Sequence, residues 1–256
     1  MSNAEYHAQS AISKSGLDLI ARCPAMFKHR RENPILPTPA MRMGTLVHTA
    51  ILEPHDLANL VVAPKIDRRS AAGKAEWEAF KVFSEGKEIV DADELDELQA
   101  ITKAVHAHPA AGQALSMLAS VEDSIFWTDG DTGIDCRCRP DGVLTNGLII
   151  DVKTTKDARP DEFAKSIANY RYHVQAAFYS DGYAAMFGGQ PKGFMFIAVE
   201  TVAPYLVACY VASPEMVIRG RADYKRDLAT YSQCLESDEW PGLPDKPVKI
   251  DLPKWA

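Results

Sequence analysis

Residues 148–155 alternate apolar and polar positions in the way that a β-strand with two unlike faces does. One face carries Leu148, Ile150 and Val152, and the other carries Ile149, Asp151, Lys153 and Thr155. The preceding Thr145-Asn146-Gly147 is a turn signal, so the pattern predicts a β-hairpin that ends in this strand. The first face requires an apolar core, whereas the second face bears charge.

The length of the predicted turn decides which residue lies opposite Asp151. A three-residue loop with glycine in the left-handed position places Asp141 directly across from Asp151 and Arg139 across from Lys153. Opposed Cβ atoms are then about 5 Å apart. A two-residue turn would slip the register by one residue and move Asp141 to the other face. We expect the three-residue loop, because it leaves the apolar face of the strand against apolar partners.

Two carboxylates this close repel each other unless a cation lies between them. Mg²⁺ commonly binds one or two carboxylates and keeps several waters, so Asp141 and Asp151 are candidate metal ligands. Lys153 on the same face could orient a water or steady the charge of a phosphate transition state. The alternative is a surface Asp/Lys pair on an edge strand, which is a common arrangement. The apolar run before Asp151 and the Pro140-Asp141 pair favour the metal site.

The rest of the chain predicts helices interleaved with short strands. The predicted helices are Lys14 to Arg22, Met41 to Leu52, Lys74 to Phe83, Asp93 to Val105, Ala110 to Leu118, one from Pro160, Tyr172 to Phe187 and Glu215 to Glu236. The predicted strands are Leu60 to Ala63, Ser124 to Thr128, Ile134 to Val143, Phe194 to Val199 and Tyr205 to Val211. This order predicts an α/β fold, a central mixed β-sheet flanked by helices with the hairpin in its middle. Residues 124–155 are expected to form a three-stranded antiparallel meander.

The chain has 256 residues, of which 46% are hydrophobic, so it can bury a sizeable core. We find no internal repeat or low-complexity linker and predict one domain over residues 1–256. The formal net charge of −7 argues against a general polyanion binder, although basic patches and bound metal can reverse the sign locally. The five cysteines lack a disulfide-framework spacing, and no apolar stretch reaches the length of a membrane span. We therefore expect a cytoplasmic protein with reduced thiols.

Several basic or imidazole side chains are further candidate site residues. His48 lies beside the apolar stripe of its helix, where a lone histidine is usually a satisfied core or boundary residue. The basic cluster at residues 28–31, with Lys28 and Arg30, fits either phosphate contact or a solvated helix end. Arg68 and Arg69 lie in a polar, glycine-containing segment that could order on DNA.

Longer blocks of the sequence resemble a known family. Pro140-Asp141 followed by Asp151-Val152-Lys153 looks like the signature of the PD-(D/E)XK nucleases. The further blocks are Tyr6-His7, Ile12 to Ser15, Gly44 to His48, Leu52-Glu53-Pro54, Cys136 to Asp141, Asp151 to Thr155 and Tyr172 to Tyr183. Together and in this order they resemble the exonuclease VIII (RecE-type) group over nearly the whole chain.

This resemblance implies a PD-(D/E)XK, restriction-endonuclease-like core and a metal-dependent DNA exonuclease. The implied reaction digests linear double-stranded DNA 5′-to-3′ without ATP, in recombination or phage-type DNA processing. The implied cofactor is Mg²⁺, with Mn²⁺ as a possible substitute. The implied partners are double-stranded DNA ends, a single-strand annealing protein and further copies of the chain in a ring-shaped homo-oligomer.

The resemblance also assigns roles to residues. The implied metal ligands are His48, Asp141, Asp151 and the backbone carbonyl of Val152. The expected catalytic residues are Asp141, Asp151, Lys153, which would orient or deprotonate the attacking water, and Gln175. Gln175 and Tyr179 share a helix face, where they would hold a DNA phosphate or that lysine, unless they are simply a polar helix face. The expected DNA contacts are Gln175, Tyr179, Arg139, Lys28, Arg30, Arg68 and Arg69.

Three alternatives remain open. The same scaffold could carry a metal-dependent endonuclease, which activity on a closed circle would reveal. It could also be a non-catalytic DNA-binding or assembly module, although the complete set of acidic, lysine and glutamine residues argues against this. A zinc-structured binder could be built on Cys136 and Cys138 with nearby histidines. On the predicted strand both cysteines face the core, which favours buried thiols.

Overall fold

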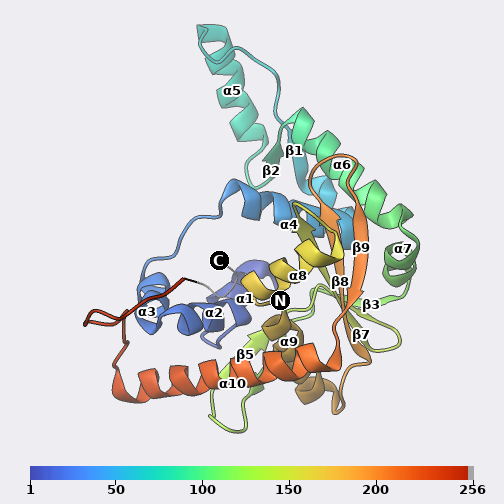
Figure 1. Cartoon of the computed structure of the whole chain (residues 1–256). Helices are drawn as coiled ribbons and strands as arrows, with labels where there is room; N and C mark the ends of the chain where they lie inside the picture. Colours follow the sequence, from blue (N-terminus) through green and yellow to red (C-terminus); the bar gives the residue numbers. More distant parts are fainter. Residues whose placement is uncertain (253–256) are drawn as a thin grey trace.

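The centre of the protein is a five-stranded sheet in the order β3-β6-β7-β8-β9 (Figure 1). In this computed structural model, residues 1–252 are described, except for the side chains of residues 56–58. The strands are β3 (Leu118–Val121), β6 (Gly142–Leu144), β7 (Leu148–Thr155), β8 (Gly193–Glu200) and β9 (Val207–Val211). Only β7 and β8 run parallel, so the sheet is mixed, and the predicted strand at 148–155 is its middle strand. The predicted α/β architecture is confirmed.

The hairpin between β6 and β7 has the predicted three-residue turn. Gly142 pairs with Ile150 and Val143 pairs with Ile149, which is the register that sets Asp141 across from Asp151. Gly147 adopts a φ of +81° and its N–H donates to the carbonyl of Leu144 at 2.8 Å. Glycine takes this left-handed conformation without the steric cost that a Cβ would bring.

The predicted three-stranded meander is wrong. The expected strand at 134–143 is divided into β5 (Asp135–Cys138) and β6, and β5 pairs with β4 (Ile125–Thr128) in a separate two-stranded sheet. The interruption falls at Pro140, which has no N–H to donate to a ladder. Strand β6 pairs with β3 instead. Arg139 consequently turns its guanidinium to the ring of Tyr6 and not to Lys153.

The eight predicted helices are present, with ends that differ by at most three residues, whereas α1 (Asn3–Ala8) and α3 (Pro24–Glu32) were not predicted. The predicted helices are α2 (Lys14–Arg22), α4 (Pro39–Leu52), α5 (Ala71–Phe83), α6 (Ala92–Ala107), α7 (Pro109–Ser116), α8 (Pro160–Asn169), α9 (Tyr172–Phe187) and α10 (Pro214–Ser237). A 3₁₀ turn, η1 (Pro54–Asn59), leads into β1 (Leu60–Val62), which pairs in parallel with β2 (Glu88–Val90) outside the central sheet. Capping explains several boundaries: Ser13 accepts the N–H of Gly16 at the start of α2, and Asp91 with Glu94 forms a capping box on α6.

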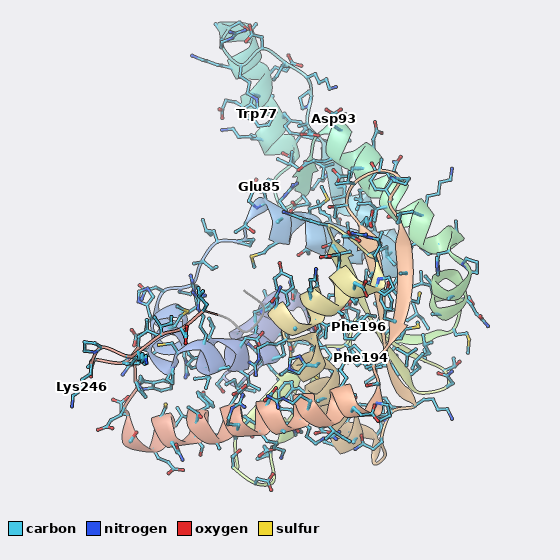
Figure 2. The ribbon with its side chains drawn as sticks, viewed as in Figure 1. Trp77, Glu85, Asp93, Phe194, Phe196 and Lys246 are labelled. Carbon is cyan, nitrogen blue, oxygen red and sulfur yellow. The ribbon has the colours of Figure 1, made fainter. Side chains whose placement is uncertain are left out.

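Helices cover both faces of the central sheet. On one face, α4, α6 and α7 bury Val47, Ile51 and Ile101 against Ile150 and Val152 of β7. On the other face, the rings of Phe194 and Phe196 lie between the sheet and helices α8 and α9 (Figure 2). Each of these fully buried side chains contributes about 1.5–3 kcal/mol of transfer free energy. The two apolar layers hold the charged strand β7 rigidly in the middle of the molecule.

Helix α9 is buried on more than one side. Ala176 faces the sheet, while Val174 and Phe178 pack with Tyr224 and Leu228 of α10. A helix that is apolar nearly all round is expected to lie inside a protein. Gly220 allows the close approach of α10, because a Cβ at that position would stand 1.9 Å from the carbonyl oxygen of His173.

Helix α5 projects from the body beyond the short β1–β2 ladder, and Trp77 lies on this projection (Figures 1 and 2). The predicted single domain stays a prediction, and its last four residues, 253–256, lie outside the described residues. In the part of the chain that is described, no helix combines the length and the apolar character needed to cross a bilayer.

Candidate metal and catalytic site

Four elements bring ionisable side chains together beside the middle strand. Asp151 and Lys153 lie on one face of β7, and Asp141 immediately precedes β6. His48 lies on α4, which covers the opposite face of the sheet, against Ile150 and Val152, and its imidazole reaches Asp141. Glu122 follows directly after β3 and takes a φ of +52°. The site is therefore built from neighbouring strand ends and one covering helix.

Asp141, His48 and Glu122 form one half of this site. Nδ1 of His48 lies 3.3 Å from Oδ2 of Asp141, and the N–H of Val152 donates to the same oxygen at 2.6 Å. The N–H of Glu122 donates to the backbone carbonyl of Asp141 at 3.3 Å, which ties the two residues together. One ligand atom from each of the three side chains lies within 4.8 Å of the others, a spacing that a single ion can span.

Asp151, Lys153 and Gln175 form the other half. Nζ of Lys153 lies 2.6 Å from Oδ2 of Asp151, and Nε2 of Gln175 donates to Oδ1 of the same carboxylate at 2.5 Å. Asp151 is completely buried, and its Oδ2 receives no hydrogen bond of regular geometry from the described residues. Nζ of Lys153 also lies 4.8 Å from the centre of the Tyr172 ring, a cation–π contact.

The charges of the site shift one another's pKa. Burial, and then the charge of Asp141, raise the pKa of Asp151 to about 6. Burial also raises the pKa of Glu122 to about 7, with Asp141 as the next cause. Burial acts in the same direction on Asp141, but His48, Lys153 and the N–H of Val152 outweigh it and lower its pKa. A site with this many buried carboxyl groups favours a bound cation.

The pKa values of Lys153 and His48 are both raised, although burial alone would lower them. Burial lowers the pKa of Lys153, but the carboxylates of Asp151 and Asp141 more than compensate and raise it. The pKa of His48 is likewise raised, because Asp141 outweighs the effect of burial. Lys153 is therefore an ammonium at neutral pH, suited to orienting a water or countering phosphate charge.

The donor set fits a hard divalent cation. Among the described residues, His48, Glu122 and Asp141 are the one group of three or more metal-ligand side chains close enough to share an ion. Two carboxylates and one imidazole suit Mg²⁺ or Mn²⁺ better than a thiolate-binding metal. The predicted ligand Asp151 lies next to this group, but its oxygens contact Lys153 and Gln175.

Two cavities flank the site and meet at Gly44 of α4. A cavity of about 880 Å³ is lined by His48, Glu122 and Arg139, and a second of about 480 Å³ is lined by Thr154 and Tyr172. Gly44 lines both cavities. The two cavities are therefore adjacent on α4, one at the metal-ligand group and the other at the tyrosine that contacts Lys153.

The predicted DNA contacts are found in different places. Arg139 lines the larger cavity and its guanidinium reaches the hydroxyl of Ser124 at 2.7 Å. Arg30 lines a third cavity, of about 680 Å³, with Arg31 and Arg137. Lys28 pairs with Asp238 at 3.1 Å at the surface.

The other predicted contacts have local partners. Arg68 stacks at 3.3 Å over the ring of Trp77, and Arg69 pairs with Asp67 at 3.0 Å, both beside the projecting α5. Tyr179 packs partly buried against Phe194, with ring centres 6.3 Å apart. Gln175 binds Asp151 directly, which places it in the site as a partner of the carboxylate.

Sequence reasoning missed Glu122 and Tyr172. Glu122 lies outside every predicted strand, and its position depends on the pairing of β3 with β6, which the expected meander did not contain. The signal that was available is the Val121-Glu122-Asp123 acidic pair that follows an apolar residue just before a predicted strand. Tyr172 was named as the start of a helix and of a resemblance block but was given no role in the site, because its contact with Lys153 depends on tertiary packing.

The zinc-binder alternative is not supported by the geometry. Cys136 and Cys138 are buried in the cluster that contains Phe178, and neither belongs to the metal-ligand group found among the described residues. Burial raises the pKa of Cys136 to about 12 and that of Cys138 well above its ordinary value. With no metal bound, both side chains are therefore thiols at neutral pH.

Comparison with known proteins identifies the family of this chain. A family model described as "PDDEXK-like domain of unknown function (DUF3799)" matches residues 13–247. The chain belongs to this PDDEXK-like family. The predicted PD-(D/E)XK resemblance is thereby confirmed, and it is consistent with the exonuclease VIII type. No curated protein matches the sequence.

A solved structure shares the fold of this chain. The crystal structure of a candidate exonuclease from Eubacterium rectale is similar over 99% of this chain and 96% of that chain, with a TM-score of 0.66 and 11% identity. An alkaline exonuclease from Laribacter hongkongensis is 13% identical over 75% of this chain and 96% of that chain. Its TM-score is 0.30.

Proposed function

We propose that this PDDEXK-like protein is a metal-dependent nuclease that hydrolyses phosphodiester bonds at the ends of linear double-stranded DNA. The observation that carries the proposal is the convergence of Asp141, Asp151 and Lys153 with His48 and Glu122 around one small volume. The name of the Eubacterium rectale neighbour and the exonuclease VIII resemblance support the exonuclease form of the activity.

In this proposal His48, Glu122 and Asp141 hold a divalent cation, together with the predicted ligands Asp151 and the carbonyl of Val152. A bound Mg²⁺ supplies Lewis-acid activation of the attacking water and of the scissile phosphate. The N–H of Val152 fixes the orientation of the Asp141 carboxylate by a hydrogen bond of 2.6 Å. Because partners that orient a ligand affect metal affinity strongly, this bond matters for binding.

Lys153 orients the attacking water and opposes the negative charge that develops on the phosphate. In the metal-free site the carboxylates of Asp151 and Asp141 raise the pKa of Lys153 and keep the side chain charged. Gln175 holds the Asp151 carboxylate from the opposite side to Lys153, so it acts as a positioning residue. The two contacts leave the carboxylate little freedom to rotate.

The basic cavity beside the site fits the phosphate backbone of DNA. Arg30, Arg31 and Arg137 line it together with Ser13 and Ser15 at the N-terminus of α2. Helix N-termini and arginine side chains are common phosphate ligands. The cavity shares His7 with the cavity at the metal-ligand group, so both belong to one proposed DNA path.

The proposed direction of digestion, 5′-to-3′, its independence of ATP, a ring-shaped homo-oligomer and a single-strand annealing partner rest on the exonuclease VIII resemblance. The experiment compares end-labelled linear duplex and closed circular DNA, with wild type and Lys153→Ala, in Mg²⁺ and in chelator. We expect the wild type to digest only the linear DNA and only with Mg²⁺, while Lys153→Ala binds DNA without cutting it. Cutting of the circle would favour an endonuclease, and equal digestion by both proteins would refute the mechanism.

A further inference from the structure

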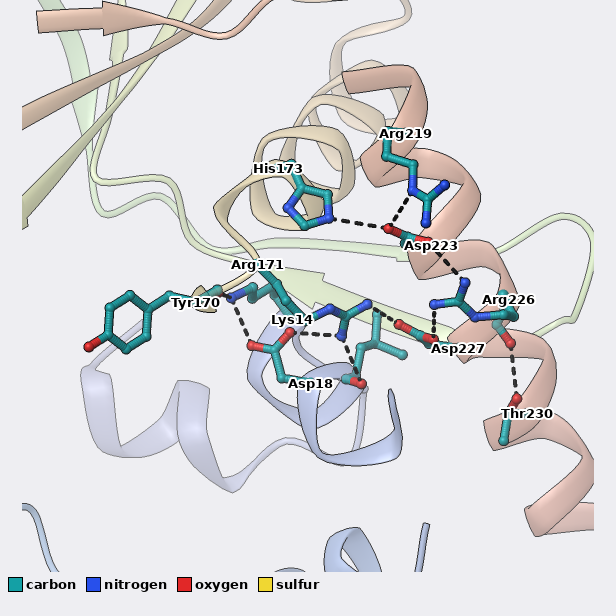
Figure 3. Close-up of polar contacts among 11 residues, drawn as sticks. Lys14, Asp18, Tyr170, Arg171, His173, Arg219, Asp223, Arg226, Asp227 and Thr230 are labelled. Atoms are coloured by element: carbon teal, nitrogen blue, oxygen red, sulfur yellow. Dashed lines mark hydrogen bonds and ion pairs between the residues drawn. The ribbon is translucent and has the colours of Figure 1, made fainter. Parts of the chain in front are cut away.

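Two tyrosine rings form a stack that leads outward from Lys153. The rings of Tyr170 and Tyr172 have centres 5.6 Å apart and planes inclined by 26°. Tyr172 is partly buried and packs against Phe163 and Phe196, whereas Tyr170 is 62% exposed. Figure 3 shows the side chain of Tyr170 projecting away from the polar network behind it. The outer ring therefore offers a free aromatic face.

The backbone that carries this stack is held firmly. Arg171, between the two tyrosines, adopts a left-handed conformation with φ 54° and ψ 42°, which is uncommon for a residue with a Cβ. Its guanidinium bonds to Asp18 at 3.0 Å and to Asp227, and Nζ of Lys14 donates to the carbonyl of Tyr170 at 2.6 Å (Figure 3). Such a conformation persists when surrounding contacts determine it. The exposed ring is thus a fixed feature of the surface.

The stack stands beside the proposed reaction centre. Nζ of Lys153 lies 4.8 Å from the centre of the Tyr172 ring, so Tyr170 is one ring removed from the lysine. Both tyrosines line the cavity of about 480 Å³ that meets the metal-side cavity at Gly44. A strand whose phosphate lies at Lys153 would bring a neighbouring base to this cavity.

The charges that line this cavity determine which part of a nucleotide it can bind. Glu97, Asp157 and Glu162 line it together with Lys156, so carboxyl groups outnumber the cation. This lining repels a phosphate but accommodates an uncharged base, whose amino groups can donate to carboxylates. Aromatic platforms bind bases of any sequence because every base has a π-face. In a duplex both faces of an internal base are already covered by its neighbours.

We propose that the exposed face of Tyr170 stacks an unpaired nucleobase of the strand that is being cut, next to the scissile phosphate. This inference rests on the proposed nuclease function and specifies its substrate as a strand that leaves the duplex at the site. It predicts a preference for frayed or single-stranded ends that does not depend on base identity.

The experiment measures binding of short single strands that carry 2-aminopurine near one end, with Ca²⁺ in place of Mg²⁺. The proteins are wild type, Tyr170→Ala, Tyr170→Phe and the matched control Phe187→Ala. Phe187 is also an exposed ring, 53% accessible and packed on a tyrosine, but it ends helix α9 away from the site. Stacking of the base quenches the fluorescence of 2-aminopurine, and a strand with an abasic position provides the second control.

We expect wild type, Tyr170→Phe and Phe187→Ala to bind alike and to quench the probe. Tyr170→Ala should bind on the order of tenfold more weakly, and the difference should vanish with the abasic strand. The proposal is overturned if Tyr170→Ala binds and quenches like wild type, if its loss persists with the abasic strand, or if wild type does not quench. A failure of the proposed function is distinct, because it would appear as absence of Mg²⁺-dependent cutting by a wild type that still quenches.

Discussion

Nε2 of Gln175 lies 2.5 Å from Oδ1 of Asp151, and this bond joins the buried helix α9 to the middle strand of the sheet. Asp151 has its other oxygen against Lys153, so the carboxylate is held between an amide and an ammonium. The position of the lysine, and with it the proposed attack on phosphate, therefore depends on how α9 packs. Three predictions follow from this dependence and from the charges around it.

Replacing Gln175 with alanine removes the only amide that contacts Asp151 among the described residues. We expect Mg²⁺-dependent cutting to fall about 10- to 100-fold, because groups that orient a metal-site carboxylate commonly have effects of this size. The control is Gln99→Ala, which alters a glutamine on α6 that lines a cavity of its own. Steady-state cutting rates, together with Tm, check the prediction. An unchanged rate for Gln175→Ala would contradict the positioning role.

The raised pKa of Glu122 should make the stability of the metal-free protein depend on pH. Burial raises its pKa to about 7 from an ordinary value near 4.5, so the folded protein prefers the protonated form. A raised carboxyl pKa contributes stability that is present below the unfolded pKa and is lost as pH rises through the folded pKa. In chelator, we therefore expect wild type and Glu122→Gln to have similar Tm at pH 4.5, and the variant to be the more stable at pH 8.

Addition of Mg²⁺ at pH 8 should reverse this order, because the metal binds the ionised carboxylate of the wild type and the variant lacks it. Thermal unfolding at the two pH values, with and without Mg²⁺, measures all four differences. If the two proteins differ equally at pH 4.5 and pH 8 in chelator, the raised pKa of Glu122 is not the cause.

The close contact of α9 with α10 at Gly220 should make stability sensitive to any side chain at that position. A Cβ at this position would stand 1.9 Å from the carbonyl oxygen of His173, so Gly220→Ala must push the two helices apart. We expect a loss of about 1–3 kcal/mol in the free energy of unfolding, which is typical of overpacking. Gly189→Ala is the control, since a Cβ there meets no atom within 4 Å. Chemical denaturation measures the free energy of unfolding of both variants. Equal values for Gly220→Ala and Gly189→Ala would refute the close contact.

The hairpin of β6 and β7 was predictable from the sequence because the information that specifies it is local. Alternation along residues 148–155 and the glycine turn specify the register, and the register sets Asp141 opposite Asp151. The helices were predictable for the same reason, since caps such as Ser13 and Asp91 are adjacent to the residues they serve.

The part of the site that sequence reasoning missed depends on contacts between distant segments. Glu122 reaches Asp141 only because β3 pairs with β6, and Pro140 divides the strand that seemed continuous. Tyr172 meets Lys153 only through the packing of α9 on the sheet. The acidic pair after Val121 does not by itself distinguish Glu122 from a surface acid, and Tyr172 looks like a core aromatic, so the sequence alone could not place them.

The central claim is that His48, Glu122 and Asp141 together hold a divalent cation. A crystal of the wild-type protein grown with Mn²⁺ tests it most directly, through the anomalous difference signal of the metal. We predict a peak within coordination distance of all three side chains, and its loss in a crystal of Asp141→Asn. A well-ordered structure with no peak there, or with the metal bound elsewhere, would contradict the account.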